Sequence, residues 1–155
     1  MRLVLVFSFI FSCLNAFAQA VETGRTRCGF VDADLAVDFG DPKVPGHLRL
    51  RLKNYRTVLD NAGSARTVNF KITDNTVGTV EFVDAAGTAY HVNPNLPGAK
   101  SECEVQVQRT EGEELAVSLS CSNLAPVMGL SLDQKFQNRV ANTRLNAPGH
   151  CVPVK

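Results

Sequence analysis

The chain has no marked excess of charge of either sign and only one long apolar run, and these two absences exclude several classes of protein. Its 155 residues carry 16 Lys and Arg against 15 Asp and Glu. A domain this close to neutral has no overall attraction for phosphate backbones or anionic membranes, so we expect no nucleic-acid partner. No segment after residue 18 approaches the ~20 consecutive apolar residues of a membrane-spanning helix, so we expect no transmembrane segment in that part.

The short motifs of the common enzyme classes are also absent. The sequence contains no Gly-x-Ser-x-Gly elbow, no phosphate-binding loop and no His-Glu-x-x-His pair. Its three histidines are scattered at positions 47, 91 and 150, and each has a structural explanation. We therefore predict a protein that is not an enzyme, with no catalytic residue, no cofactor and no metal site.

The first residues have the three parts of an export signal. Arg2 makes a short positive start, the stretch Leu3–Leu14 is almost continuously apolar, and Ala16-Phe17-Ala18 gives the small-x-small pattern of a cleavage site. Cleavage before Gln19 leaves 137 of the 155 residues, with 15 basic and 15 acidic side chains because Arg2 is lost. This combination of features is typical of a bacterial signal peptide.

A lipid anchor at Cys13 is the alternative to free secretion. The bulky Phe11 stands where a lipoprotein signal has a small or β-branched residue, so we consider the anchor unlikely in comparison with ordinary export. The sequence thus predicts a signal peptide at 1–18 and a single β domain at 19–155, which is periplasmic or secreted.

The cysteines of the exported chain predict disulfide bonds. An even number of cysteines outside the cytoplasm is typical of a disulfide framework, and four of them allow three connectivities. A four-thiolate zinc site normally shows two close pairs such as Cys-x-x-Cys, and here no two are nearer than eighteen positions. The four are Cys28, Cys103, Cys121 and Cys151.

One β-hairpin selects among the connectivities. Segments 103–109 and 114–121 alternate polar and apolar residues, and residues directly opposite each other share one face of a sheet. The two apolar rows therefore meet only across a loop of odd length, because a slip of one residue would set valines against glutamines. A loop centred on Gly112 places Cys103 opposite Cys121, and we predict that these two are bonded.

The remaining cysteines, Cys28 and Cys151, pair by elimination. A loop at 110–112 would keep the same faces but offset the cysteines of the hairpin by two residues, so the cysteines favour the first register. The second bond would close nearly the whole domain and tie its two ends together.

The segment 66–93 predicts a three-stranded meander. Apolar residues alternate along each strand, and a three-residue loop ending at Gly87 sets Phe82 opposite Tyr90. The outer face of this meander would align Lys71, Glu81 and His91. In this arrangement His91 is the solvent-side neighbour of a glutamate rather than a ligand.

A first hairpin combines the segments 31–39 and 47–53, joined by a Pro/Gly loop. If its apolar rows match, Asp34 and Asp38 lie across from the basic side chains and form ion pairs with them. The alternative is an anion-binding site, and a calcium site on the aspartates of 31–39 fits poorly because strand positions wrap an ion badly. The basic side chains, here called the basic stripe, are His47, Arg49, Arg51 and Lys53.

The pattern weakens after Cys121. Leu132, Phe136 and Val140 recur every four residues and predict a short helix, and 142–155 reads as an irregular tail. About seven short strands with short turns predict a mainly β fold, an antiparallel β-sandwich or small barrel stapled by disulfides.

The function predicted from these features is a non-catalytic binding or structural role in the bacterial cell envelope or the medium, with an unidentified envelope component or protein as partner. The alternative is a small secreted inhibitor of an extracellular or periplasmic hydrolase. The loop 93–98 would then be the inhibitory segment, because its two prolines lower the entropy lost on binding. Otherwise that loop is an ordinary connection.

Overall fold

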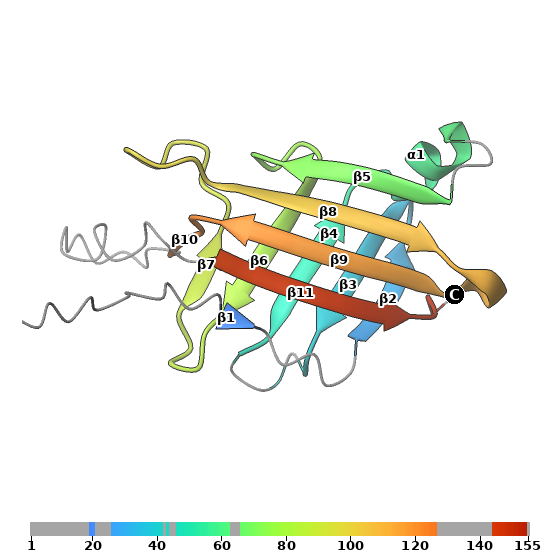
Figure 1. Ribbon diagram of the computed structural model, residues 1–155, viewed down its shortest axis with the longest axis horizontal. Coiled ribbons are helices and arrows are strands. Elements are labelled where there is room, and N and C mark those ends of the chain that lie inside the picture. The colour runs from blue at the N-terminus through green and yellow to red at the C-terminus, as the bar shows by residue number, and fades with distance from the viewer. Residues whose placement is uncertain are drawn as a thin grey trace, which may run out of the picture.

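Two β-sheets packed face to face form the protein, as shown in Figure 1. This computed structural model describes residues 19–20, 26–41, 43, 46–62, 66–126 and 144–154. The predicted signal peptide at 1–18 and the predicted helix around 132–140 lie outside the described residues.

The sheets have five and six strands, and every pairing between neighbouring strands is antiparallel except that of β1 with β11. The first sheet has the order β1 (Gln19–Ala20), β11 (Arg144–Cys151), β9 (Leu115–Ser122), β8 (Glu102–Arg109) and β5 (Thr67–Ile72). The second has the order β10 (Ala125–Pro126), β7 (Ala89–His91), β6 (Gly78–Val83), β4 (Leu48–Leu52), β3 (Asp34–Phe39) and β2 (Thr26–Val31). The predicted antiparallel sandwich is therefore confirmed, with more strands than the seven expected.

Both predicted disulfides are present. Cys103 and Cys121 lie directly opposite each other on β8 and β9, with their Cα atoms 4.1 Å apart. Cys28 on β2 is bonded to Cys151 on β11, so this bond joins the two sheets. The bonds span 18 and 123 positions of sequence. In the chain-entropy model such loops stabilise the fold by roughly 3 and roughly 5 kcal/mol.

The space between the sheets is filled by the apolar face of each strand. On β8 and β9 the predicted rows pair as expected, with Val105 opposite Leu119 and Val107 opposite Val117. These four side chains are at most 2% exposed. Phe70 and Phe82 are buried with them, and Tyr90 packs against the same cluster while partly exposed. The predicted core face of this hairpin is confirmed.

The prediction of a three-stranded meander at 66–93 is wrong. Strand β5 crosses to the other sheet and pairs with β8, so Lys71 lies opposite Glu104 and not beside Glu81. Strand β6 pairs with β4 instead, and Gly78 makes this possible because a Cβ there would lie 2.5 Å from the carbonyl oxygen of Arg51. The remaining hairpin of β6 and β7 has the predicted register, with Phe82 opposite Tyr90.

The segment 31–39 is not one strand, because the chain turns at Asp32 and Ala33 between β2 and β3. Asp32 has a φ of 57°, a left-handed conformation that aspartate tolerates better than most residues. Val31 is consequently 49% exposed rather than part of the core.

The irregular tail predicted at 142–155 is also wrong, since Arg144–Cys151 forms β11. Its neighbour β9 pairs with all eight of its residues. Pro148 is tolerated because β11 lies near the sheet edge, where β1 covers only two residues. Gly149 allows the close approach of the sheets, because a Cβ there would lie 2.5 Å from the Thr26 hydroxyl oxygen.

One short helix that the sequence pattern did not indicate, α1 (Tyr55–Asn61), lies at one end of the sandwich. Its first residue, Tyr55, is 1% exposed. The Tyr55 ring lies between those of Phe30 and Phe70, with centroid distances of 6.3 and 6.0 Å. The helix therefore covers the core between β2 and β5.

The alternation along β9 gives a direct test of the core face. We expect Val117→Asp to lower the free energy of unfolding by several kcal/mol, because it buries a charge without a partner. Ser118→Asp, one residue along on the outward face, is the control and should change it by less than about 1 kcal/mol. Chemical denaturation of the oxidised proteins measures both, and equal stability of the two variants would contradict the assignment.

Candidate functional site

The basic stripe lies on the outward face of β4 and the residues beside it, and its two arginines are paired as predicted. Arg49 Nε lies 2.8 Å from Asp38 Oδ1, and Arg51 Nε lies 2.8 Å from Asp34 Oδ2. The arginine side chains remain 50% and 48% exposed. Exposed pairs of this kind contribute little to stability, and they neutralise the charge that an anion would bind.

The pairing of Arg49 belongs to a longer row of charges across the six-stranded sheet. Neighbouring strands place successive members of this row directly opposite each other. The row consists of Arg27, Asp38, Arg49, Glu81 and His91. Signs alternate from Arg27 to Glu81, so each arginine faces a carboxylate, and opposite charges across strands favour this register over others.

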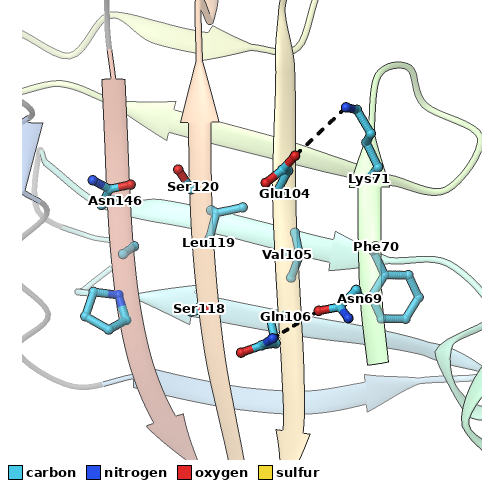
Figure 2. Close-up of a pocket in the computed structure, with 12 residues that line it drawn as sticks. Asn69, Phe70, Lys71, Glu104, Val105, Gln106, Ser118, Leu119, Ser120 and Asn146 are labelled. Atoms are coloured by element: carbon cyan, nitrogen blue, oxygen red, sulfur yellow. Dashed lines mark hydrogen bonds and ion pairs between the residues drawn. The ribbon is translucent and has the colours of Figure 1, made fainter. Parts of the chain in front are cut away.

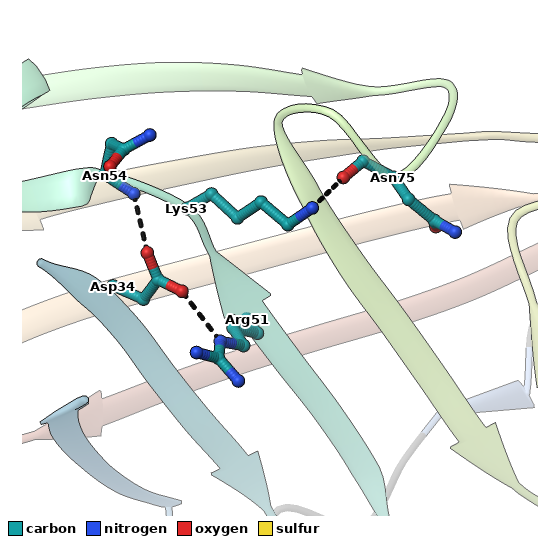
Figure 3. Close-up of polar contacts among 5 residues, drawn as sticks. All are labelled: Asp34, Arg51, Lys53, Asn54 and Asn75. Atoms are coloured by element: carbon teal, nitrogen blue, oxygen red, sulfur yellow. Dashed lines mark hydrogen bonds and ion pairs between the residues drawn. The ribbon is translucent and has the colours of Figure 1, made fainter. Parts of the chain in front are cut away.

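Asp34 holds the corner where β4 leads into α1, as Figure 3 shows. Its carboxylate accepts hydrogen bonds from the Asn54 backbone N–H and from Arg51, both at 2.8 Å. The Asn54 N–H, and then Arg51, hold the pKa of Asp34 below its ordinary value of 3.8. Lys53 donates to the backbone carbonyl of Asn75 on the neighbouring connection.

Anion binding by the basic stripe would therefore involve cationic side chains that already have partners. Arg49, Arg51 and Lys53 each bind an oxygen of the protein itself. The backbone carbonyl of His47 accepts a hydrogen bond from the Val83 N–H at 3.0 Å. An anion would have to displace these contacts, and anion binding by the basic stripe stays a prediction.

A second surface, which the sequence reasoning missed, is the outward face of the five-stranded sheet. Every outward residue of β9 is small, whereas β8 and β11 on either side carry longer or ring-bearing side chains. The result is a hollow of about 710 Å³ that crosses the middle of β5, β8, β9 and β11, shown in Figure 2 and here called the trough. Its floor is formed by Ser118 and Ser120, and its walls by Glu104, Gln106, Asn146 and Pro148, with Asn69 and Lys71 of β5 beyond the β8 wall.

The charged groups at the trough are neutralised by one another. Lys71 Nζ lies 3.1 Å from Glu102 Oε2 and 3.9 Å from Glu104 Oε1. Hydrogen bonds from Lys100 and Lys71 lower the pKa of Glu102, so this carboxylate is ionised at neutral pH. Figure 2 shows Lys71 at the β5 edge, beyond the wall formed by β8.

Uncharged polar groups make up the rest of the trough. The Gln106 side-chain amide donates to Asn69 Oδ1 at 3.1 Å, which fixes the wall on the β8 side. Within the described part of the chain, the side chains of Ser118, Ser120 and Asn146 form no hydrogen bond. These groups are free to donate to and accept from a ligand.

The loop predicted as an inhibitory segment connects β7 to β8. The Asn93 side-chain oxygen accepts from the Asn95 N–H at 2.9 Å, and the Ser101 hydroxyl oxygen accepts from the Asn93 N–H at 3.0 Å. Pro94 and Pro97 are both exposed. The loop is therefore held in one shape, which either a connection or an inhibitory segment could use.

A smaller hollow of about 260 Å³ lies at the α1 end of the sandwich. Its lining is mostly apolar and includes Phe30, Tyr55 and Leu59. Burial raises the pKa of Tyr55, so its hydroxyl is protonated at neutral pH. The Arg56 guanidinium lies 4.3 Å from the centroid of the Phe30 ring and stabilises that ring as one side of the hollow.

The described residues contain no group of three or more His, Cys, Asp or Glu side chains that could hold a metal ion. The four cysteines among the described residues form disulfides, so none of these four is a thiolate ligand for zinc. Among the same residues, no helix is long and apolar enough to cross a membrane. Comparisons of the chain with known protein families, with curated proteins and with solved structures find no match.

The pairing of the basic stripe predicts weak binding of polyanions. We expect no retention of a chain that begins at Gln19 on heparin at ~0.15 M salt, because Asp34 and Asp38 already neutralise the arginines. The double variant Arg49→Gln and Arg51→Gln should lose only about 1 kcal/mol of stability. Salt-dependent retention of the wild type that this variant abolishes would instead identify the basic stripe as a functional surface.

The contacts of Asp34 predict its titration. A lowered pKa means that the ionised contacts stabilise the fold above pH 3.8 and that this contribution is lost as the pH falls through the lowered value. In Arg51→Gln the pKa should rise but stay below 3.8, because the Asn54 N–H makes the larger contribution. NMR titration of the carboxyl carbon measures this, with Lys71→Gln as the control that leaves Asp34 unchanged. A wild-type pKa at or above 3.8 would be inconsistent with the observed hydrogen bonds.

Proposed function

We propose that this protein is an exported, non-catalytic binding module that attaches to a component of the cell envelope or of the medium, and that the trough is its binding surface. Two disulfides indicate an oxidising environment, which supports export to the periplasm or outside the cell. The observation that carries the proposal is the trough itself, a hollow in which the side chains of Ser118, Ser120 and Asn146 have no partners in the described structure.

The contrast with the basic stripe favours the trough. Arg49 and Arg51 are already bound to carboxylates of the protein, so a ligand there gains new contacts only by breaking existing ones. Ser118, Ser120 and Asn146 offer hydrogen-bonding groups that no described residue occupies. A ligand in the trough therefore exchanges water for protein at each group without separating an ion pair.

The trough is also rigid, which lowers the entropy lost on binding. Strand β9 pairs with β8 over eight residues and with β11 over eight residues. The bond between Cys103 and Cys121 joins β8 to β9 on the opposite, core-facing side of the sheet. The floor and both walls are thus held by main-chain ladders rather than by loops.

A second candidate function is inhibition of a hydrolase by the loop 93–98. It is supported by the internal hydrogen bonds of Asn93 and by the two exposed prolines, because a pre-ordered loop loses little entropy in a complex. The trough is preferred because its hollow of about 710 Å³ is larger than the one of about 530 Å³ beside the loop, and because Ser118, Ser120 and Asn146 leave hydrogen-bonding groups free there.

Binding to fractionated envelope material and to concentrated medium tests the proposal. The oxidised protein without its signal peptide should be retained, and the variant Ser118→Gln with Ser120→Gln should lose most retention because the longer side chains fill the trough. Its stability should change by less than about 1 kcal/mol, since both residues are exposed. Thr79→Gln, at an outward position of the other sheet, is the matched control and should bind as the wild type does.

Two results would contradict the proposal. Equal retention of the wild type and the trough variant would show that the trough is not the binding surface. Inhibition of a secreted hydrolase that Leu96→Ala abolishes and the trough variant leaves intact would assign the function to the loop instead.

A further inference from the structure

Strand β5 lies at one edge of the five-stranded sheet, and one side of its main chain is unpaired. The Arg109 N–H donates to the Arg66 carbonyl oxygen at 2.7 Å, and the same register continues along β5 and β8. In an antiparallel ladder, pairs that exchange hydrogen bonds alternate with pairs that do not. The N–H and C=O groups of Thr67, Asn69 and Lys71 therefore point away from β8. Among the described residues, no main-chain hydrogen bond reaches them from the open side.

The other sheet edges in the described ranges are short or blocked. Strands β1 and β10 have only two residues each. Strand β11, which β1 covers over two residues, carries Pro148. At β2, the Val154 N–H donates to the Cys28 carbonyl oxygen at 3.0 Å, so a segment of the same chain covers that edge. Short strands, prolines and covering segments prevent edge-to-edge pairing, and the six residues of β5 have none of these.

The outward side chains of β5 do not block its open edge. A lysine on an edge strand discourages pairing when it extends over that edge. Here Lys71 Nζ lies 3.1 Å from Glu102 Oε2 and 3.9 Å from Glu104 Oε1, so the side chain leans toward β8, as Figure 2 shows for Glu104. Asn69 is held toward the same side, because its Oδ1 accepts from the Gln106 amide at 3.1 Å. The main chain of β5 is thus left accessible.

The helix α1 also leaves this edge open. It lies near one end of β5 in Figure 1, and the rings of Tyr55 and Phe70 meet on the core-facing side of the strand with centroids 6.0 Å apart. No hydrogen bond joins the described part of α1 to the outward-pointing main-chain groups of β5.

The sequence of β5 is complementary to itself in an antiparallel pairing centred on Asn69. In this register Asn69 lies opposite Asn69 of a second copy, and Thr67 lies opposite Lys71 of that copy. Each of these pairs exchanges two hydrogen bonds, and no two like charges face each other. On the core side Val68 lies opposite Phe70 of the second copy, so the partly exposed Val68 gains an apolar neighbour.

We propose that two copies of this protein pair through β5, so that their five-stranded sheets join into one continuous sheet. Two identical antiparallel strands in a sheet are related by a two-fold axis perpendicular to that sheet. Both troughs therefore open on the same face of the joined sheet. A surface that repeats the ligand would be held at two points, which strengthens attachment without a new contact. This last consequence rests on the proposed function, whereas the dimer does not.

Sedimentation velocity over a range of concentrations tests the inference on a chain that begins at Gln19. We expect a reversible dimer in the wild type. Asn69→Pro removes the central N–H donor and should raise the dimer dissociation constant by roughly 10-fold or more. The variant should stay folded, because proline is tolerated where the N–H of an edge strand points away from the sheet. Asn69→Ala loses the contact with Gln106 but keeps the N–H, so this control should dimerise as the wild type does.

Hydrogen exchange measured by NMR gives a second readout that needs no variant. The amides of Thr67, Asn69 and Lys71 should exchange slowly at concentrations where the dimer forms and quickly on dilution. The amides of Val68 and Phe70 bond to β8 and should stay protected at both.

Three results would overturn the dimer. The first is a monomer at every concentration up to the millimolar range. The second is a dimer that Asn69→Pro leaves intact while the three outward-pointing amides of β5 exchange quickly. The third is protection of these amides only after a different protein or peptide is added, which would assign the edge to another partner. Retention on envelope material through the trough could persist in each case, so the proposed function would be judged separately.

Discussion

The register between β8 and β9 is the constraint on which both the core and the trough depend. It places Cys103 opposite Cys121 and sets the inward valines of the two strands against each other. Because side chains alternate between faces, the same register places Ser118 and Ser120 outward. A slip of one residue would bury these serines and expose Val117, and the disulfide would no longer close. The bond that stabilises the hairpin therefore also maintains the polar face of the sheet.

The two outward faces of the sandwich differ in how their polar groups are satisfied. On the six-stranded sheet, acidic and basic residues alternate across strands and bind one another, as Asp38 and Arg49 do. On the five-stranded sheet, β9 presents Ser118 and Ser120 without partners in the described structure. Both arrangements give the sheet a polar outward face, but only the second leaves hydrogen-bonding groups available to a ligand. This difference is the physical basis for assigning the binding surface.

The alternation of polar and apolar residues along each strand was sufficient to predict how strands pair when they are neighbours in the sequence. The register of β8 and β9 and the pairing of Arg49 with Asp38 both follow from matching apolar rows. The partner of β5 could not be predicted in this way, because its alternation suits either sheet equally well. Asp32 interrupted an alternation that otherwise continues through the turn between β2 and β3.

The trough itself depended on a strand that sequence reasoning did not find. Pro148 and Gly149 both lower β propensity, so the sequence 144–151 does not by itself indicate a strand. With β8 as the only predicted neighbour of β9, the sequence indicates no second wall beside the serines of β9 and therefore no hollow. The signal that could have indicated the site was the run of small residues at alternate positions from Ala116 to Ser122.

The location of the bound ligand tests the account most directly. A crystal structure of the protein with the envelope fragment that retains it should show this fragment in the trough over β8, β9 and β11, with Ser118, Ser120 and Asn146 within hydrogen-bond distance. A fragment bound instead at the loop 93–98 or over the basic stripe, with the trough empty, would contradict the assignment of the trough as the functional surface.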